Sequence, residues 1–132
     1  MMNRKLSHAR IGLVALAIGA LSACASMMQA SAPAKVSDGA LVGPNGMTLY
    51  TFDRDAASPG RSACNGPCVA NWPPLMADGT AQSTGDWSVI ARDDGQKQWA
   101  YKGKPLYFWA KDGKPGDKNG DGFNKVWHTA TP

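Results

Sequence analysis

The chain carries one short pattern twice. Residues 46–55 and residues 103–112 share a Gly, a Leu, a Tyr, an aromatic residue and an Asp at one constant offset. A Pro-Gly pair follows both segments, and a Trp closes each copy. Such internal repetition indicates one structural unit used twice. The sequence therefore predicts two hairpin-plus-loop repeats, at about 46–77 and 103–132.

Short apolar and aromatic runs lie between turn signals. Pro44-Asn45-Gly46 and Asp94-Gly95 favour tight hairpin turns. All ten acidic residues are Asp, and 15 Gly and 9 Pro further favour turns over helix interiors. We expect a mainly β, small single domain of antiparallel hairpins over residues 39–132, with a short helix at 68–72. The expected strands are 40–42, 48–52, 87–91, 97–101, 106–109 and 126–129.

Residues 1–23 have the composition of a secretory signal peptide. Residues 1–10 carry Arg4, Lys5 and Arg10 without an acid, and residues 11–21 are apolar. This apolar segment is shorter than the roughly 20 residues that span a bilayer. Leu21-Ser22-Ala23-Cys24 at its end resembles the lipobox of bacterial lipoproteins. That resemblance implies cleavage before Cys24 and covalent lipid, such as palmitate, on this residue.

The expected lipid predicts a location. One acyl chain holds a protein to a membrane only marginally, whereas two or more hold it stably. Ala25 and Ser26 follow Cys24, in place of the Asp associated with retention at the inner membrane. We expect an outer-membrane lipoprotein that faces the periplasm, if the source is a diderm bacterium. Residues 24–38, rich in Ala, Ser, Met and Pro, are expected to form a flexible tether.

The net charge argues against nucleic acid as a partner. The whole chain has a formal net charge of +4, but three of its 14 basic residues lie in the signal peptide. The remainder is close to neutral and shows no basic run, so it lacks the electrostatic footprint of a nucleic-acid-binding protein.

Cys64 and Cys68 are the two cysteines that remain after Cys24. Three residues separate them, which is neither the spacing of thioredoxin-like motifs nor that of haem attachment. An exported protein meets an oxidising compartment, so we predict a structural disulfide between them. A metal or redox role for this pair is the alternative.

The duplicated segments fit a known motif. Tyr50-x-Phe52-x-x-Asp55 and Tyr107-x-Trp109-x-x-Asp112 both read Yx(FWY)xxD. The chain thus resembles a family of predicted bacterial lipoproteins with this motif, also described as a secreted repeat of unknown function. The resemblance implies no activity. The residues themselves predict a core aromatic pair with a turn-fixing Asp in each copy; a paired site made by the two copies is the alternative.

Two metal sites can be drawn from the sequence. Asp117, Asn119 and Asp121 before a Gly copy the first half of a calcium loop, with His128 in place of the final Glu. A polar turn is the favoured interpretation of that segment. His128 could also join Cys64, Cys68 and a Met in a soft site suited to copper, although an ordinary surface histidine is favoured.

We expect a non-catalytic envelope module that binds a partner or stabilises the cell surface. No nucleophile has a plausible base near it in the sequence, so no enzyme and no cofactor beyond the lipid are predicted. An envelope protein or a glycan is the expected partner, besides the membrane itself. The alternative is a redox- or copper-linked accessory protein of extracytoplasmic electron transfer.

Overall fold

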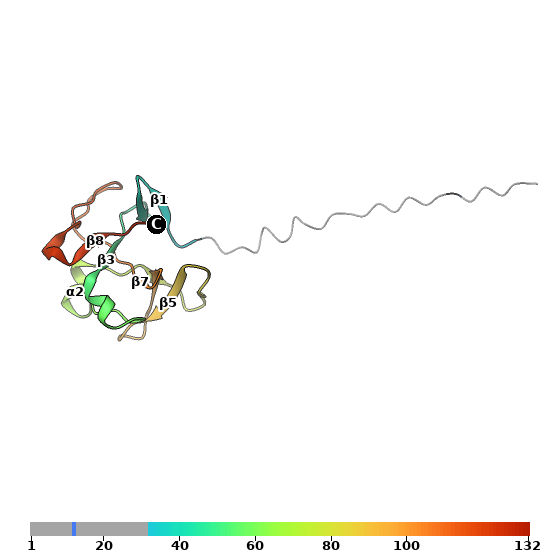
Figure 1. The fold of residues 1–132 in the computed structure, drawn as a ribbon, viewed down its shortest axis with the longest axis horizontal. Helices are drawn as coiled ribbons and strands as arrows, with labels where there is room; N and C mark the ends of the chain where they lie inside the picture. The colour runs from blue at the N-terminus through green and yellow to red at the C-terminus, as the bar shows by residue number, and fades with distance from the viewer. Residues whose placement is uncertain (1–11, 13–31) are drawn as a thin grey trace, which may run out of the picture. The chain divides into compact units, whose positions relative to one another are not determined.

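A computed structural model of the chain describes Gly12 and residues 32–132 (Figure 1). The predicted signal peptide, Cys24 and most of the predicted tether lie outside the described residues. The described part is mainly antiparallel strand with little helix, as the sequence predicts. Its elements in chain order are β1 (Lys35–Ser37), β2 (Ala40–Val42), β3 (Tyr50–Phe52), η1 (Asp53–Ala57), α2 (Pro67–Asn71), β4 (Met76–Ala77), β5 (Trp87–Ala91), β6 (Lys97–Tyr101), β7 (Lys104–Pro105), η2 (Phe123–Lys125) and β8 (Trp127–Thr129).

The strands form three small groups. β1 pairs with β2, β3 pairs with β8, and β6 lies between β4 and β5 while β7 also pairs with β6. Gly39 and Gly95 adopt φ of 75° and 83° in the β1–β2 and β5–β6 turns, a conformation that favours glycine. The predicted hairpin at Asp94-Gly95 is therefore confirmed. The predicted turn at Pro44-Asn45-Gly46 also forms, closed by a 2.9 Å bond from the Gly43 amide to the Met47 carbonyl.

The folded unit begins earlier than the sequence predicts. Lys35–Ser37, assigned to the tether, is strand β1 and pairs with β2. Ala34 before it is buried with Leu41 and Leu49. The predicted boundary at Gly39 is therefore wrong. The chain turns at Asp38-Gly39 and brings β1 back along β2. The side chains of β1 are exposed, so the sequence shows no apolar pattern there that would predict a strand.

The strand predicted at 106–109 does not form as a regular strand. Tyr107 makes isolated bridges to Tyr50 and Pro74, and the regular strand β7 lies just before it. The amides of Phe108 and Ala110 donate to the carbonyls of Pro73 and Asn71, at 2.7 and 2.8 Å. Pro73 and Pro74 have no amide proton and cannot donate hydrogen bonds in the opposite direction, so a regular strand pair does not form.

Tyr50 and Tyr107, which hold the same position in the two repeats, pair with each other. The amide of Tyr50 donates to the Tyr107 carbonyl at 2.8 Å, and the Tyr107 amide donates to the Tyr50 carbonyl at 3.0 Å. Equivalent residues that exchange both bonds of an antiparallel pair must lie beside a local twofold axis. The two repeats are therefore related by an approximate twofold rotation.

The rest of the pairing follows the same rotation. The Ala130 amide donates to the Leu49 carbonyl at 2.8 Å, and the Leu75 amide donates to the Leu106 carbonyl at 2.9 Å. Each motif segment therefore pairs with the end of the other repeat. In Figure 1, β3 of the first repeat and β8 of the second run side by side. The repeats are intertwined, and neither could bury its apolar residues alone.

Two hydrophobic clusters form the core. One is aliphatic, with Trp87, Trp99, Tyr101 and Phe108 packed against it, and consists of Ala34, Leu41, Leu49, Leu75, Leu106 and Ala130. The other is aromatic apart from one cysteine and consists of Tyr50, Cys64, Trp72, Tyr107, Trp109 and Trp127. Both clusters draw on both repeats, and the aromatic cluster contains three of the four motif aromatics.

Candidate functional site

The tyrosine of each motif bonds the aspartate of the other motif. Tyr50 Oη donates to Asp112 Oδ2 at 2.6 Å, and Tyr107 Oη donates to Asp55 Oδ2 at 2.7 Å. Both tyrosines are fully buried, and both aspartates are buried as well. The two copies of Yx(FWY)xxD thus complete each other across the twofold axis.

The second oxygen of each aspartate holds a loop of its own repeat. Asp55 Oδ1 accepts the Ala63 amide at 2.7 Å, and Asp112 Oδ1 accepts the Asn119 amide at 3.1 Å. Burial raises the pKa of the Asp55 carboxyl above its ordinary value. The hydrogen bonds from the Ala63 amide and the Tyr107 phenol, together with the charge of Arg92, oppose that rise. Burial is also the main cause that raises the pKa of both motif tyrosines, so their phenols stay neutral.

The other motif aromatics, Phe52 and Trp109, form one stack of four rings with the tryptophans that close the two repeats. Trp72 and Trp127, at equivalent positions in the repeats, lie face to face with 3.8 Å between ring centroids and 4° between planes. Phe52 stacks on Trp127 at 4.2 Å, and Trp109 stacks on Trp72 at 4.0 Å. Each motif aromatic therefore packs on the tryptophan of the other repeat. Phe123 lies against the outer ring, Trp109, at 4.9 Å.

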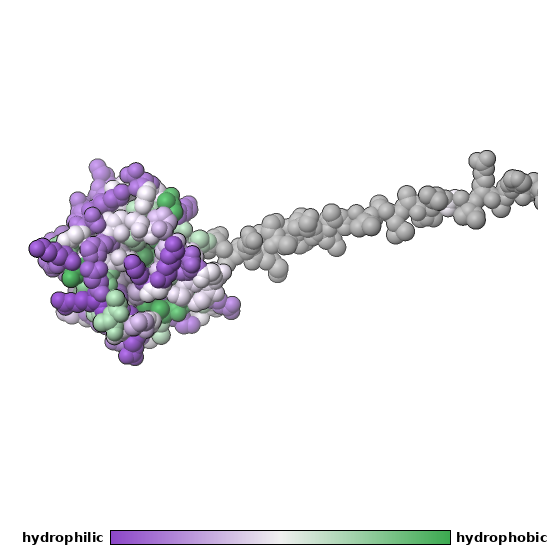
Figure 2. All heavy atoms as spheres, viewed as in Figure 1, coloured by the Kyte–Doolittle hydropathy of each residue, from purple (hydrophilic) through white to green (hydrophobic). Residues whose placement is uncertain are grey.

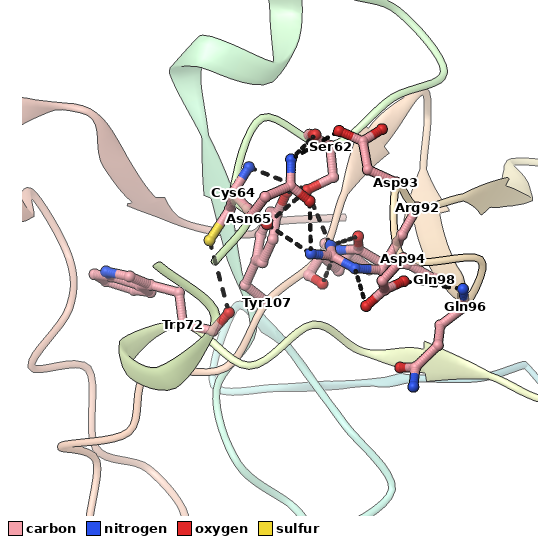
Figure 3. A network of polar contacts seen from close by, with 11 residues as sticks. Ser62, Cys64, Asn65, Trp72, Arg92, Asp93, Asp94, Gln96, Gln98 and Tyr107 are labelled. Atoms are coloured by element: carbon pink, nitrogen blue, oxygen red, sulfur yellow. Dashed lines mark hydrogen bonds and ion pairs between the residues drawn. The ribbon is translucent and has the colours of Figure 1, made fainter. Parts of the chain in front are cut away.

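A buried arginine ties the first repeat's loop to this core (Figure 3). Arg92 Nη1 donates to Ser62 Oγ at 3.0 Å and to Gln98 Oε1 at 2.7 Å, and Nη2 donates to the Cys64 carbonyl at 2.6 Å. Its Nε has no hydrogen-bond partner and lies 4.0 Å from the exposed carboxylate of Asp94. The side chain of Arg92 is only 1% exposed.

Ser62 joins this arginine to the motif. Its Oγ lies 2.6 Å from Tyr107 Oη, and since Tyr107 donates to Asp55, Ser62 is the donor. Sequence reasoning missed Arg92, Ser62 and Gln98, because these residue types are ordinarily exposed. Gln98 lies on the strand period of β6, but the buried state of a polar side chain depends on its distant partners.

The predicted disulfide between Cys64 and Cys68 is present. Cys64 is fully buried beside Trp72, at the start of the loop that leads into α2. Disulfide-bonded sulfurs are not thiolate ligands. The copper site drawn from Cys64, Cys68 and His128 therefore does not assemble. His128 Nε2 instead lies 2.8 Å from Asp53 Oδ2, in an exposed pair.

The acidic loop forms turns. Asp117 Oδ2 accepts the amides of Gly113 and Lys114, and Asp121 Oδ1 accepts the Thr129 amide at 2.9 Å. Asn119 contributes its backbone amide to Asp112. Within the part of the chain that the structure describes, no group of three or more His, Cys, Asp or Glu side chains is placed to hold a metal ion.

A pocket of about 380 Å³ lies where β3 and β8 meet the β6–β7 turn. Its lining includes Thr51, Asp53, Lys102, Lys104 and His128. On the face in view in Figure 2 the surface is largely hydrophilic, and apolar residues lie there only in small separate patches. Across residues 32–132, no helix has the length and apolar character needed to cross a membrane.

Comparison with known families gives one result. A family model described as "Secreted repeat of unknown function" matches residues 33–76 and 88–131. No curated protein and no solved structure matches the chain. Both matched segments begin before the repeats predicted from the sequence, because each unit includes the hairpin ahead of its motif. These hairpins are β1–β2 in the first unit and β5–β6 in the second.

Proposed function

The chain belongs to the family of secreted repeats of unknown function, and from that premise we propose that it is a non-catalytic binding or structural module held at the outer membrane by lipid on Cys24. The proposal has two parts, the absence of catalysis and the anchor. The structure and the sequence support them separately.

The non-catalytic part is supported by one observation above all: the motif's ionisable groups satisfy each other. Tyr50 is bonded to Asp112 and Tyr107 to Asp55, and all four side chains are buried. A catalytic acid or base must reach its substrate. These side chains instead stabilise the junction of two intertwined repeats. The electron-transfer alternative loses support because Cys64 and Cys68 are joined to each other and not to a metal.

The anchor is supported by the lipobox-like sequence before Cys24 and by where the folded unit begins. Ala34 is already part of the core. Residues 25–33 therefore separate the lipidated residue from the fold, and such a segment reaches at most about 30 Å when extended. A module tied so closely would work near the membrane surface, within reach of envelope proteins and glycans.

Metabolic labelling with an alkyne-tagged palmitate tests the anchor. We expect label on the wild-type chain and its sedimentation with the outer membrane, and loss of both in Cys24→Ala. The double variant Cys64→Ala, Cys68→Ala is the control, because its label should persist. Label that remains in Cys24→Ala, or wild-type protein found without fatty acid, would overturn the proposal.

A further inference from the structure

The lining of the polar pocket beside β3 and β8 differs from the equivalent place across the twofold axis. Thr51 of β3 lies in its wall, paired with His128 of β8. The twofold rotation carries Thr51 onto Phe108 and His128 onto Pro73. Phe108 is half-buried against the aliphatic cluster and lies so close to Gly43 that a Cβ there would meet its Cζ at 2.6 Å. An aromatic ring therefore packs where the other copy leaves a pocket.

Two charged residues of the pocket also have apolar counterparts, whereas Lys102 corresponds to the polar Asn45. Asp53 corresponds to Ala110, and Lys104 corresponds to Met47. The backbone on both sides is the same, as the matching bonds from the Asp53 amide to Val126 and from the Ala110 amide to Asn71 show, each 2.8 Å long. At these positions the same backbone thus carries apolar side chains in one copy and charged ones in the other.

Two lysines in the lining of the pocket, Lys102 and Lys104, form no ion pair with a carboxylate of residues 32–132. Asp53, the acidic side chain in the lining, is occupied by His128 at 2.8 Å. Lys102 also adopts φ of 49°, which is unfavourable for a residue with a Cβ.

One aromatic ring completes the site. Tyr101 is half-buried in the lining, and Lys102 Nζ lies 5.3 Å from its centroid. The His128–Asp53 pair and the Thr51 hydroxyl in the same lining offer both donors and acceptors. A volume of about 380 Å³ lies at the small end of the range for ligand pockets. The lining thus combines cations, hydrogen-bonding groups and an apolar ring.

We propose that this pocket binds an acidic saccharide, a sugar ring that carries a carboxylate or a phosphate. The lysines pair with the acidic group, the His128–Asp53 pair and Thr51 bond the hydroxyls, and the Tyr101 ring covers an apolar face of the sugar. This choice of ligand rests on the proposed location in the envelope, where acidic glycans are within reach. The pocket itself does not depend on the lipid anchor.

Saturation-transfer difference NMR on the purified full chain tests the proposal, with D-glucuronate and glucose 6-phosphate as probes. We expect saturable transfer to both, and at least about fivefold weaker binding of D-glucose, acetate and inorganic phosphate. No saturable transfer from either acidic sugar at tens of millimolar would overturn the proposal. Equal binding of glucose, or of acetate and phosphate alone, would overturn the assignment to an acidic sugar.

The other repeat supplies the variants. Lys104→Met and Thr51→Phe install the counterpart residues, and we expect each to weaken binding by about tenfold or more. Lys114→Met removes a charge outside the pocket and should leave binding unchanged. Thermal unfolding shows whether the variants fold. Folded variants that bind as well as the wild type would overturn the site. A negative result here leaves the labelling of Cys24 untouched, so the two proposals fail separately.

Discussion

The phenol of Tyr50 donates its hydrogen bond to Asp112, 62 residues away in the other repeat, across 2.6 Å. Tyr107 returns the arrangement by donating to Asp55 at 2.7 Å. The Tyr and Asp of one Yx(FWY)xxD copy therefore do not serve each other. The motif describes half of a reciprocal contact, and a single repeat would leave a buried carboxylate and a buried phenol without partners, at a cost of about 1–3 kcal/mol for each group.

Alkaline pH should destabilise the fold through the two buried tyrosines. Burial, reinforced by the neighbouring aspartates, raises the pKa of Tyr50 and Tyr107 in the folded state, whereas in the unfolded chain a tyrosine ionises near pH 10. Their contribution is thus complete below pH 10 and is lost as the pH rises above it. We expect the free energy of unfolding to fall by up to about 1.4 kcal/mol per pH unit for each tyrosine.

Urea titrations between pH 8 and 12, followed by tryptophan fluorescence, measure this loss. Absorbance at 295 nm should show that the phenols of Tyr50 and Tyr107 ionise only on unfolding. Ionisation of these two phenols near pH 10 in folded protein would contradict the burial of the motif.

Removal of the buried arginine should weaken the first repeat's loop. Arg92→Met leaves Ser62, Gln98 and the Cys64 carbonyl without their donor, and we expect a loss of about 3 kcal/mol. Arg92→Lys keeps the charge but lacks the forked guanidinium group that bonds several acceptors at once. Its free energy of unfolding should therefore lie between those of the wild type and Arg92→Met. Chemical denaturation provides the comparison. A loss within about 0.5 kcal/mol for Arg92→Met would show that the network is not formed.

The disulfide should stabilise the domain modestly. It closes a loop of only five residues, Cys64 to Cys68, for which the chain-entropy model gives about 2 kcal/mol. We expect Cys64→Ala, Cys68→Ala to lose about this amount and to remain folded by circular dichroism. Mass spectrometry of the unreduced wild type checks the premise, since two alkylatable thiols would exclude the bond.

A methyl group at Gly120 should disturb the aromatic stack. A Cβ there would lie 2.8 Å from Trp72 Cη2 and 3.1 Å from Tyr50 Cε1, both in a closely packed region. We expect Gly120→Ala to cost about 1–3 kcal/mol. Gly79→Ala is the matched control, because a Cβ at that position meets nothing within 4 Å. Equal midpoints of thermal unfolding for the two variants would contradict the packing of Trp72 against the loop.

Local signals predicted the repeat, most strands and the hairpin turns. Asp94-Gly95 is a turn because glycine readily takes the positive φ that a tight hairpin needs. The disulfide was predicted from the oxidising compartment expected for an exported protein and from the two cysteines that remain after Cys24. Strand β1 was missed because its side chains are exposed and its pairing depends on the turn after it. The strand at 106–109 was overpredicted because its partner contains Pro73 and Pro74.

Long-range relations were beyond the sequence. The motif marked Tyr50 and Asp112 as important, but nothing in the spacing indicates that a tyrosine bonds the aspartate of the other copy. Arg92 carried no signal at all, since its burial depends on partners that are distant in the chain. The pocket could be identified only from the sequence and the structure together. The contrast between Thr51 and Phe108 has meaning only once the twofold rotation is known.

Double-mutant cycles test the central claim, the reciprocal exchange between the repeats. Tyr50→Phe combined with Asp112→Ala should show a coupling free energy of about 1.5–3 kcal/mol, because the pair shares a charge-assisted hydrogen bond. Tyr50→Phe combined with Asp55→Ala, within one motif copy, should couple by less than about 0.5 kcal/mol. Coupling inside the copy and none between the copies, measured by urea unfolding, would contradict the account.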